Sequence, residues 1–235
     1  MFDRSAAWYD ALYAWKDYGA ESARLWELLR AGGQTGGTLL EVACGTGNHL
    51  VHLRHHYSVE GLDLDAGLLE RAREKVPEVP LHLGDMRAFD LGRQFDVVTC
   101  LFSSIGYTRE RSGLRRAIAC MARHLAPKGL LVVEPWFPPD RWHRGRMHLL
   151  TTDQPDLKVA RMSRADLVEG AENPVSILDF QYLVGTPAGV DHLVERHELG
   201  LFTRDQMDEA FDAAALKAEY DDQGLSGRGL YTGRR

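Results

Sequence analysis

The sequence has few cysteines, no long apolar run and no excess of positive charge. Its three cysteines form neither a C-x-x-C pair nor a zinc-type spacing with histidine, so we expect reduced, buried thiols and no metal centre. No segment approaches the roughly 18 apolar residues of a membrane helix, and residues 1–15 are too polar for a signal peptide. These absences predict a cytoplasmic protein with no membrane partner.

Acidic residues outnumber basic ones. The 34 aspartates and glutamates against 28 lysines and arginines give a formal net charge of −6. Non-specific binding to nucleic acid needs a basic surface, so we expect no nucleic-acid partner. At 235 residues the chain can bury a substantial core. The sequence therefore predicts a globular protein of one domain with an insertion, or of two small domains.

Strands and helices alternate through the first part of the chain. Apolar runs predict strands at 38–43, 58–63, 81–83, 95–101 and 130–134. Helical spacing predicts a helix over 5–31 that breaks near Lys16 to Gly19, and further helices at 46–56, 66–75 and 109–125. This alternation is typical of an α/β fold, in which helices cover both faces of a parallel sheet.

The pattern changes after Pro138-Pro139. Alternating segments predict an antiparallel sheet with strands at 146–152, 157–168, 175–185 and 190–201. Thr203 then caps a helix that reaches about Ala214, and two closing strands follow at 217–220 and 229–232. We therefore expect a core at 1–140, an appended antiparallel sheet at 141–202 that serves as a lid, and core elements again at 203–235.

The segment Leu39 to Gly47, LLEVACGTG, predicts a buried strand that breaks into a glycine turn before a helix. Such a turn suits a nucleotide-type ligand, because the helix N-terminus offers unpaired N–H groups and glycine allows close approach. A P-loop needs a lysine after the last glycine, and here Asn48 follows. A dinucleotide fingerprint needs a third glycine where Leu50 stands. The remaining possibility is S-adenosylmethionine (SAM), which carries no phosphate.

Two acids follow at the ends of the next strands. Asp63 ends the second strand, 16 residues after Gly47, where a carboxylate can accept both ribose hydroxyls. Its neighbour Asp65 is better placed to cap the next helix. Asp85 ends the third strand, where it can accept the adenine amine beside the Met86 N–H. The glycine turn, Asp63 and Asp85 follow one another in the order that a SAM site requires, so together they favour SAM as the ligand.

At this point the sequence resembles known families. LLEVACGTG, GLDLD and GDM resemble the class I SAM-dependent methyltransferases. CLFSSIGY, VVEPWFPP and SGRGLYTG resemble bacterial N-methyltransferases of nucleotide-linked amino sugars, which make the dimethylamino sugars of macrolide antibiotics, and this resemblance spans the chain. It implies a Rossmann-like seven-stranded methyltransferase fold, SAM as cofactor, a thymidine diphosphate (TDP) amino-deoxysugar as substrate, and a homodimer.

The resemblance also assigns residues. The expected cofactor-binding residues follow the strand ends and the N-terminal helix: Tyr18, Glu41, Ala43, Gly45, Thr46, Gly47, Asp63, Leu64, Asp85, Met86, Leu101 and Phe102. Asp63 stands where the family has glutamate. Tyr9 and Tyr107 are expected to orient the amine as catalytic residues. Ser104, Trp136 and Arg228 are expected to bind the nucleotide sugar.

Departures from the family fall in the substrate region. Phe137 stands where members often carry a second tryptophan, and Tyr107 stands where some have histidine. A different N or O acceptor and a non-catalytic SAM-binding protein therefore stay open. For Arg141, Arg144 and Arg146 we expect a solvated face, with diphosphate contact as the alternative. The helix of His49, His52, His55 and His56 is expected at the surface, without a metal.

Overall fold

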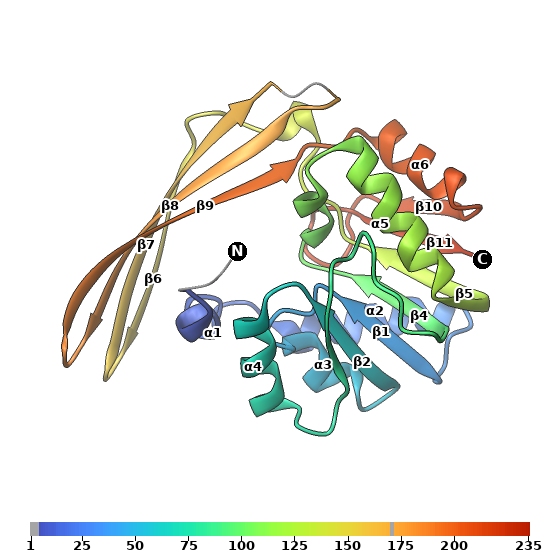
Figure 1. Ribbon diagram of the computed structural model, residues 1–235, viewed down its shortest axis with the longest axis horizontal. Helices are drawn as coiled ribbons and strands as arrows, with labels where there is room; N and C mark the ends of the chain where they lie inside the picture. Colours follow the sequence, from blue (N-terminus) through green and yellow to red (C-terminus); the bar gives the residue numbers. More distant parts are fainter. Residues whose placement is uncertain (1–4, 170–171) are drawn as a thin grey trace.

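The computed structural model describes residues 5–169 and 172–235 and contains two sheets. The larger sheet has seven strands and is flanked by helices, while a four-stranded antiparallel sheet stands beside it (Figure 1). The strand order of the larger sheet is β10 (Lys217–Asp221), β11 (Leu230–Arg234), β5 (Leu125–Val133), β4 (Phe95–Cys100), β1 (Thr38–Val42), β2 (Ser58–Asp63) and β3 (Leu81–Leu83). The predicted α/β fold is confirmed.

Helices bury both faces of the seven-stranded sheet. The described helices are η1 (Ser5–Trp8), α1 (Tyr9–Leu12), α2 (Tyr18–Ala31), α3 (Asn48–Leu53), α4 (Ala66–Lys75), η2 (Ser104–Thr108), α5 (Arg111–Arg123), η3 (Pro139–Arg141) and α6 (Arg204–Ala213). Neighbouring residues of β1 point to opposite faces: Leu39 packs with apolar residues of α2, α3 and α4, and Leu40 with those of α5 and α6. This two-sided burial explains the continuous apolar runs of the core strands.

The chain changes direction across the sheet between β1 and β4. From β1 it runs outward through β2 and β3, and it then returns to β4 and β5 on the other side, with all five strands parallel. At such a switch point the loops after the two central strands diverge and leave a crevice at their carboxyl ends. The glycine turn after β1 and the segment after β4 therefore lie on either side of this crevice.

The smaller sheet is the predicted antiparallel insertion. Its strands, in order, are β6 (Met147–Gln154), β7 (Leu157–Val168), β8 (Val175–Thr186) and β9 (Gly189–Gly200). Leu12 of α1 packs with Val159, Phe180 and Tyr182 of this sheet. The N-terminal segment thus lies between the four-stranded sheet and the core (Figure 1).

The predicted break in the N-terminal helix is confirmed, and one strand boundary differs from expectation. The chain turns between Leu12 and Tyr18, where the side chain of Asp17 accepts a hydrogen bond from the Ala20 N–H at 2.8 Å and starts α2. Strand β5 begins at Leu125, five residues before the expected start, because a register shift and a left-handed Lys128 (φ 66°) absorb the predicted turn. Across the described ranges, every helix is too short or too polar to span a membrane.

Candidate active site

A cavity of about 610 Å³ opens at the carboxyl ends of the core strands and extends under the four-stranded sheet. It is lined by residues predicted for both ligands: Tyr9, Ala43, Gly45, Asp63, Leu64, Asp85, Met86, Phe102, Ser104, Tyr107, Trp136 and Arg228. A second cavity of about 40 Å³ is lined by Tyr18, Glu41, Thr46 and Leu101, and shares Gly45 and Phe102 with the first. Gly47 lines neither cavity. A side chain there would meet Ala72 of α4.

The glycine turn is shaped by left-handed backbone. Gly45 and Gly47 have φ values of 56° and 74°, and the Gly47 N–H donates to the Cys44 carbonyl oxygen at 2.9 Å. A Cβ added to Gly45 would find no heavy atom within 4 Å, and Gly45 lines both cavities. A ligand can therefore approach the backbone here closely.

Asp63 connects the glycine turn to the end of β2. Its Oδ2 accepts the Gly45 N–H at 2.8 Å, and its Oδ1 accepts the Asp65 N–H at 2.9 Å. Burial raises the pKa of Asp63, and these two N–H groups oppose that rise. Each carboxylate oxygen keeps a further lone pair, which suits a vicinal diol. Asp65 caps α4 as expected, accepting from the N–H groups of Gly67 and Leu68.

Asp85 has a partner that the sequence did not indicate. Arg87 donates through Nε and Nη2 to its carboxylate, at 2.9 Å and 2.5 Å, and these bonds hold the pKa of Asp85 low. Arg87 also lines the large cavity. The carboxylate is thus fixed in its charged form at the edge of the expected adenine site.

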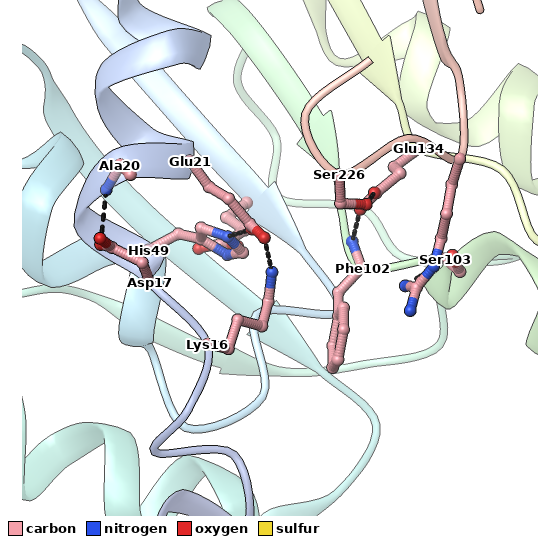
Figure 2. A network of polar contacts seen from close by, with 11 residues as sticks. Lys16, Asp17, Ala20, Glu21, His49, Phe102, Ser103, Glu134 and Ser226 are labelled. Carbon is pink, nitrogen blue, oxygen red and sulfur yellow. Dashed lines mark hydrogen bonds and ion pairs between the residues drawn. The ribbon is translucent and has the colours of Figure 1, made fainter. Parts of the chain in front are cut away.

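A chain of ionic groups underlies the small cavity. Figure 2 shows Lys16 paired with Glu21, whose Oε2 lies 3.1 Å from Nε2 of His49. Nδ1 of His49 lies 3.0 Å from Oε1 of Glu41. Oε2 of Glu41 is buried and has no hydrogen-bond partner among the described residues. An unsatisfied carboxylate oxygen beside a cavity fits an ammonium group such as that of SAM.

The expectation of an exposed histidine helix is wrong for His49. Its side chain is only 6% exposed, because the first turn of α3 faces α2 and β1. Burial lowers the pKa of His49, but the hydrogen bonds with Glu21 and Glu41 outweigh it and raise that pKa to about 9. Residues 5–169 and 172–235 contain no cluster of potential metal ligands.

His49 should make folding stability pH-dependent. A histidine pKa raised from 6.5 to about 9 in the folded state contributes stability that is complete below pH 6.5 and is lost as the pH rises to 9. We expect wild type to lose up to about 3 kcal/mol more unfolding free energy than His49→Gln between these values. Urea denaturation of both proteins across this range measures the difference. Parallel pH profiles would contradict the assignment.

The loop after β4 is held in a strained conformation. Phe102 and Ser103 have φ values of 52° and 61°, unusual for residues other than glycine. The Phe102 N–H donates to Glu134 Oε2 at 2.6 Å, and Ser226 donates to Oε1 of the same carboxylate (Figure 2). Glu134 therefore ties the end of β5 to this loop and to the C-terminal loop, a role that strand-end polarity alone did not reveal.

Arg228 lies in the C-terminal loop and lines the large cavity. Its guanidinium carbon is 5.2 Å from the Phe102 ring centroid and 5.7 Å from that of Trp136, and Nη1 lies 3.4 Å from Ser103 Oγ. The indole N–H of Trp136 donates to Ser176 Oγ at 2.9 Å, which anchors this ring to the four-stranded sheet. Arg228 thus joins the predicted substrate residues at the boundary of core and sheet.

Four further arginines line the same cavity, and one of them, Arg109, pairs with Glu198. Arg161 is buried on β7 and donates to Tyr13 Oη at 2.9 Å, whereas Arg141 and Arg146 are exposed. Arg144 pairs instead with Asp166. Within the described part of the chain, no carboxylate forms an ion pair with Arg141, Arg146, Arg161 or Arg228. For Arg141 and Arg146 the placement favours the diphosphate alternative over a purely solvated face.

Two tyrosines stand between these groups. Tyr9 lines both cavities, and its ring centroid lies 4.6 Å from that of Tyr13. Tyr107 lines the large cavity, and its Oη lies 2.9 Å from Nδ1 of His197 on β9. Burial raises the pKa of both phenols well above the usual value, so both stay protonated at neutral pH. They can orient a substrate by hydrogen bonding, and their individual roles stay predictions.

Comparison with known proteins gives consistent results. Residues 39–129 match the model of a methyltransferase domain family. The chain is 43% identical to the dTDP-3-amino-3,6-dideoxy-alpha-D-glucopyranose N,N-dimethyltransferase of Streptomyces fradiae, over 93% of this chain and 85% of that protein. The crystal structure of Streptomyces venezuelae DesVI superposes with a TM-score of 0.90 at 38% identity, covering 97% of each chain.

A SAM-bound structure is also similar. CalS10, an amino pentose methyltransferase from Micromonospora echinaspora, superposes with a TM-score of 0.83 at 39% identity, over 94% of this chain and 92% of that one. The cofactor of the chain is SAM, as the turn and the two acids predicted. The chain therefore belongs to the family of SAM-dependent N-methyltransferases that includes these sugar-modifying enzymes.

Proposed function

We propose that the protein transfers methyl groups from SAM to the amino group of a nucleotide-linked amino-deoxysugar, most specifically a TDP sugar. One observation supports this best. A single cavity has carboxylates of the core strands at one end and, at the other, four arginines without a carboxylate partner among the described residues. Guanidinium groups suit the diphosphate of a nucleotide sugar, and each bidentate contact strengthens the binding.

The bound cofactor supplies a methyl group on a positively charged sulfur, with a neutral thioether as leaving group. The task of the chain is alignment, which contributes up to about 7–11 kcal/mol in the best intramolecular cases. Asp63 and Glu41 hold the cofactor by its ribose and its ammonium group. Tyr9 and Tyr107 direct the sugar amine, and Arg228 holds the diphosphate. A neutral amine needs no strong general base to attack, so these phenols orient rather than ionise.

The four-stranded sheet acts as the lid of this site, and residues 141–202 form the appended unit between core segments 1–140 and 203–235. The lid supplies Arg161 and the wall behind Tyr107, and α1 fills the space beneath it. A cavity closed over the amine excludes water, which strengthens the hydrogen bonds that direct it.

The outer face of the lid supports a homodimer. Leu149, Met162, Gln181 and Val194 stand opposite one another on consecutive strands, and their three apolar side chains are between 39% and 56% exposed. Exposed apolar patches on a sheet are common at protein interfaces. Sedimentation equilibrium should give a dimer at micromolar concentration, and Leu149→Lys combined with Val194→Lys should give a monomer. A wild-type monomer would contradict the assignment.

We also place the enzyme in the cytoplasm, where its three free and buried cysteines would stay reduced. Fractionation of the host cells measures this directly, and recovery of the protein in another compartment would contradict it.

The function is tested by methyl transfer. The protein is incubated with labelled SAM and a panel of TDP-linked sugars that carry the amine at C3 or C4, with the matching hydroxy sugars as controls. We expect label in the amino sugars and none in the hydroxy sugars. Binding of SAM in calorimetry without labelling of any amino sugar would overturn the proposal.

A further inference from the structure

A buried polar chain continues from Tyr107 into the lid. His197 on β9 is 1% exposed, and its two ring nitrogens face different partners. Nδ1 lies 2.9 Å from Tyr107 Oη, and Nε2 lies 3.5 Å from Oε2 of Glu195. Glu195 and His197 are two residues apart on one strand, so their side chains project from the same face. The cavity wall at Tyr107 is thus connected to a buried imidazole and a carboxylate.

The surroundings of Glu195 fix the direction of these hydrogen bonds. Its carboxylate accepts from Ser5 Oγ at 2.8 Å, from the Ser5 N–H at 3.2 Å and from Tyr182 Oη at 3.2 Å. Burial raises the pKa of Glu195, but the hydrogen bonds with His197 and Ser5 outweigh it and lower that pKa below its usual value. Glu195 is therefore an anion that needs donors, which places the imidazole proton on Nε2.

It follows that Nδ1 of His197 is an acceptor. Tyr107 donates its phenol proton to this nitrogen, and the phenol oxygen keeps lone pairs that can accept an N–H group at the cavity wall. An amine that donates there keeps its own lone pair free to attack the methyl group.

We propose that His197 is a positioning residue for methyl transfer: held by Glu195, it fixes Tyr107 as the acceptor for the substrate N–H and takes up the proton that the nitrogen releases. The inference rests on the proposed function, because it assigns the amine to the cavity wall at Tyr107.

Each methyl transfer accounts for every bond and proton involved. Each transfer forms one N–C bond and breaks one S–C bond, whose electron pair stays on sulfur, and the nitrogen becomes an ammonium. The ammonium proton passes to Tyr107 Oη as the phenol proton passes to Nδ1, which leaves an imidazolium beside the Glu195 carboxylate. Release of that proton to solvent restores the starting state. A monomethylated amine must lose its proton in this way before a second transfer.

Other ionisable groups surround this chain. Tyr13 follows α1, Arg161 projects from β7 and Tyr182 from β8, and the pKa of Tyr107 responds to all three after its burial. The ring of Phe180 lies 4.7 Å from that of His197 and covers one face of the imidazole. These groups are neutral or cationic, and among the residues that the structure describes Glu195 is the carboxylate in contact with His197, where it would stabilise an imidazolium.

The test compares His197→Gln with wild type on an amino sugar. Glutamine can still accept from Tyr107 but cannot take up a proton. We expect kcat at pH 7 to fall about 10- to 100-fold with KM within threefold, recovery of kcat toward pH 9, and accumulation of monomethylated product. His192→Gln is the matched control, because His192 is an exposed residue of the same strand whose Nε2 contacts Gln181. It should behave as wild type.

Two further measurements keep the outcome clear. If His197→Gln does not fold, Tyr107→Phe should show the same pH dependence and the same excess of monomethylated product. A loss that is equal at every pH, with an unchanged ratio of products, would overturn the proposal. Nitrogen NMR of His197 in wild type should show a proton on Nε2, and a proton on Nδ1 would overturn it even if no amino sugar proved to be a substrate.

Discussion

Replacing Asp63 by asparagine is expected to weaken SAM binding by about 100-fold or more. The carboxylate accepts backbone N–H groups from Gly45 and Asp65, and an amide would turn its NH₂ group toward one of these donors. It would also replace one charged acceptor for the ribose hydroxyls. Hydrogen bonds to a charged group contribute about 1.5–3 kcal/mol each, and about 1.4 kcal/mol corresponds to a tenfold change in Kd.

Calorimetric titration with SAM measures this effect, and two variants serve as controls. Asp63→Glu keeps the carboxylate and should retain most of the affinity. Asp65→Asn should bind SAM nearly as wild type does, because asparagine caps a helix about as well as aspartate. If Asp63→Asn and Asp65→Asn weakened SAM equally, loss of negative charge in the cavity would explain the result, and the ribose assignment would be wrong.

Replacing Arg228 by alanine is expected to raise KM for the nucleotide sugar about 10- to 100-fold while the Kd for SAM stays within about twofold. The guanidinium lies over Phe102 and Trp136 in the large cavity and has no carboxylate partner among the described residues. A diphosphate would therefore provide its counter-charge. Steady-state kinetics with a TDP amino sugar and calorimetry with SAM measure the two affinities separately.

Arg228→Lys should recover part of the affinity, since it restores the charge without the bidentate geometry. Arg24→Ala, at an exposed arginine of α2 that lines neither cavity, should change neither constant. Equal losses of substrate and SAM affinity in Arg228→Ala would show that the residue maintains the loop structure instead.

The cofactor-binding half of the site could be predicted because short stretches of sequence determine the strands and turns that form it. The strands that lead into Gly45, Asp63 and Asp85 can be predicted from apolar runs and turns, and parallel strands bring their carboxyl ends to one edge of a sheet. Asp65 was recognisable as a helix cap for the same reason. The family resemblance then supplied the substrate residues, which local patterns alone would not have separated from packing.

Three of the residues that the sequence did not predict, His49, Glu195 and His197, depend on contacts between distant segments. His49 looked exposed because the helix of four histidines is polar, yet α2 packs against its first turn and Glu21 reaches it from 28 positions away. His197 and Glu195 share a strand face, but alternation alone cannot say that this face lies behind Tyr107, 90 positions earlier. Arg87 was missed because its partner, two residues away, was assigned to the cofactor alone.

A crystal structure of the protein with S-adenosylhomocysteine and TDP tests the central claim most directly, namely that one cavity holds both ligands. We predict the ribose of the cofactor on Asp63, its amino group at Glu41, and the diphosphate of TDP at Arg228 beneath the lid. The sulfur should then face the open space beside Tyr107. TDP bound outside this cavity, or the two ligands competing for one position in it, would contradict the account.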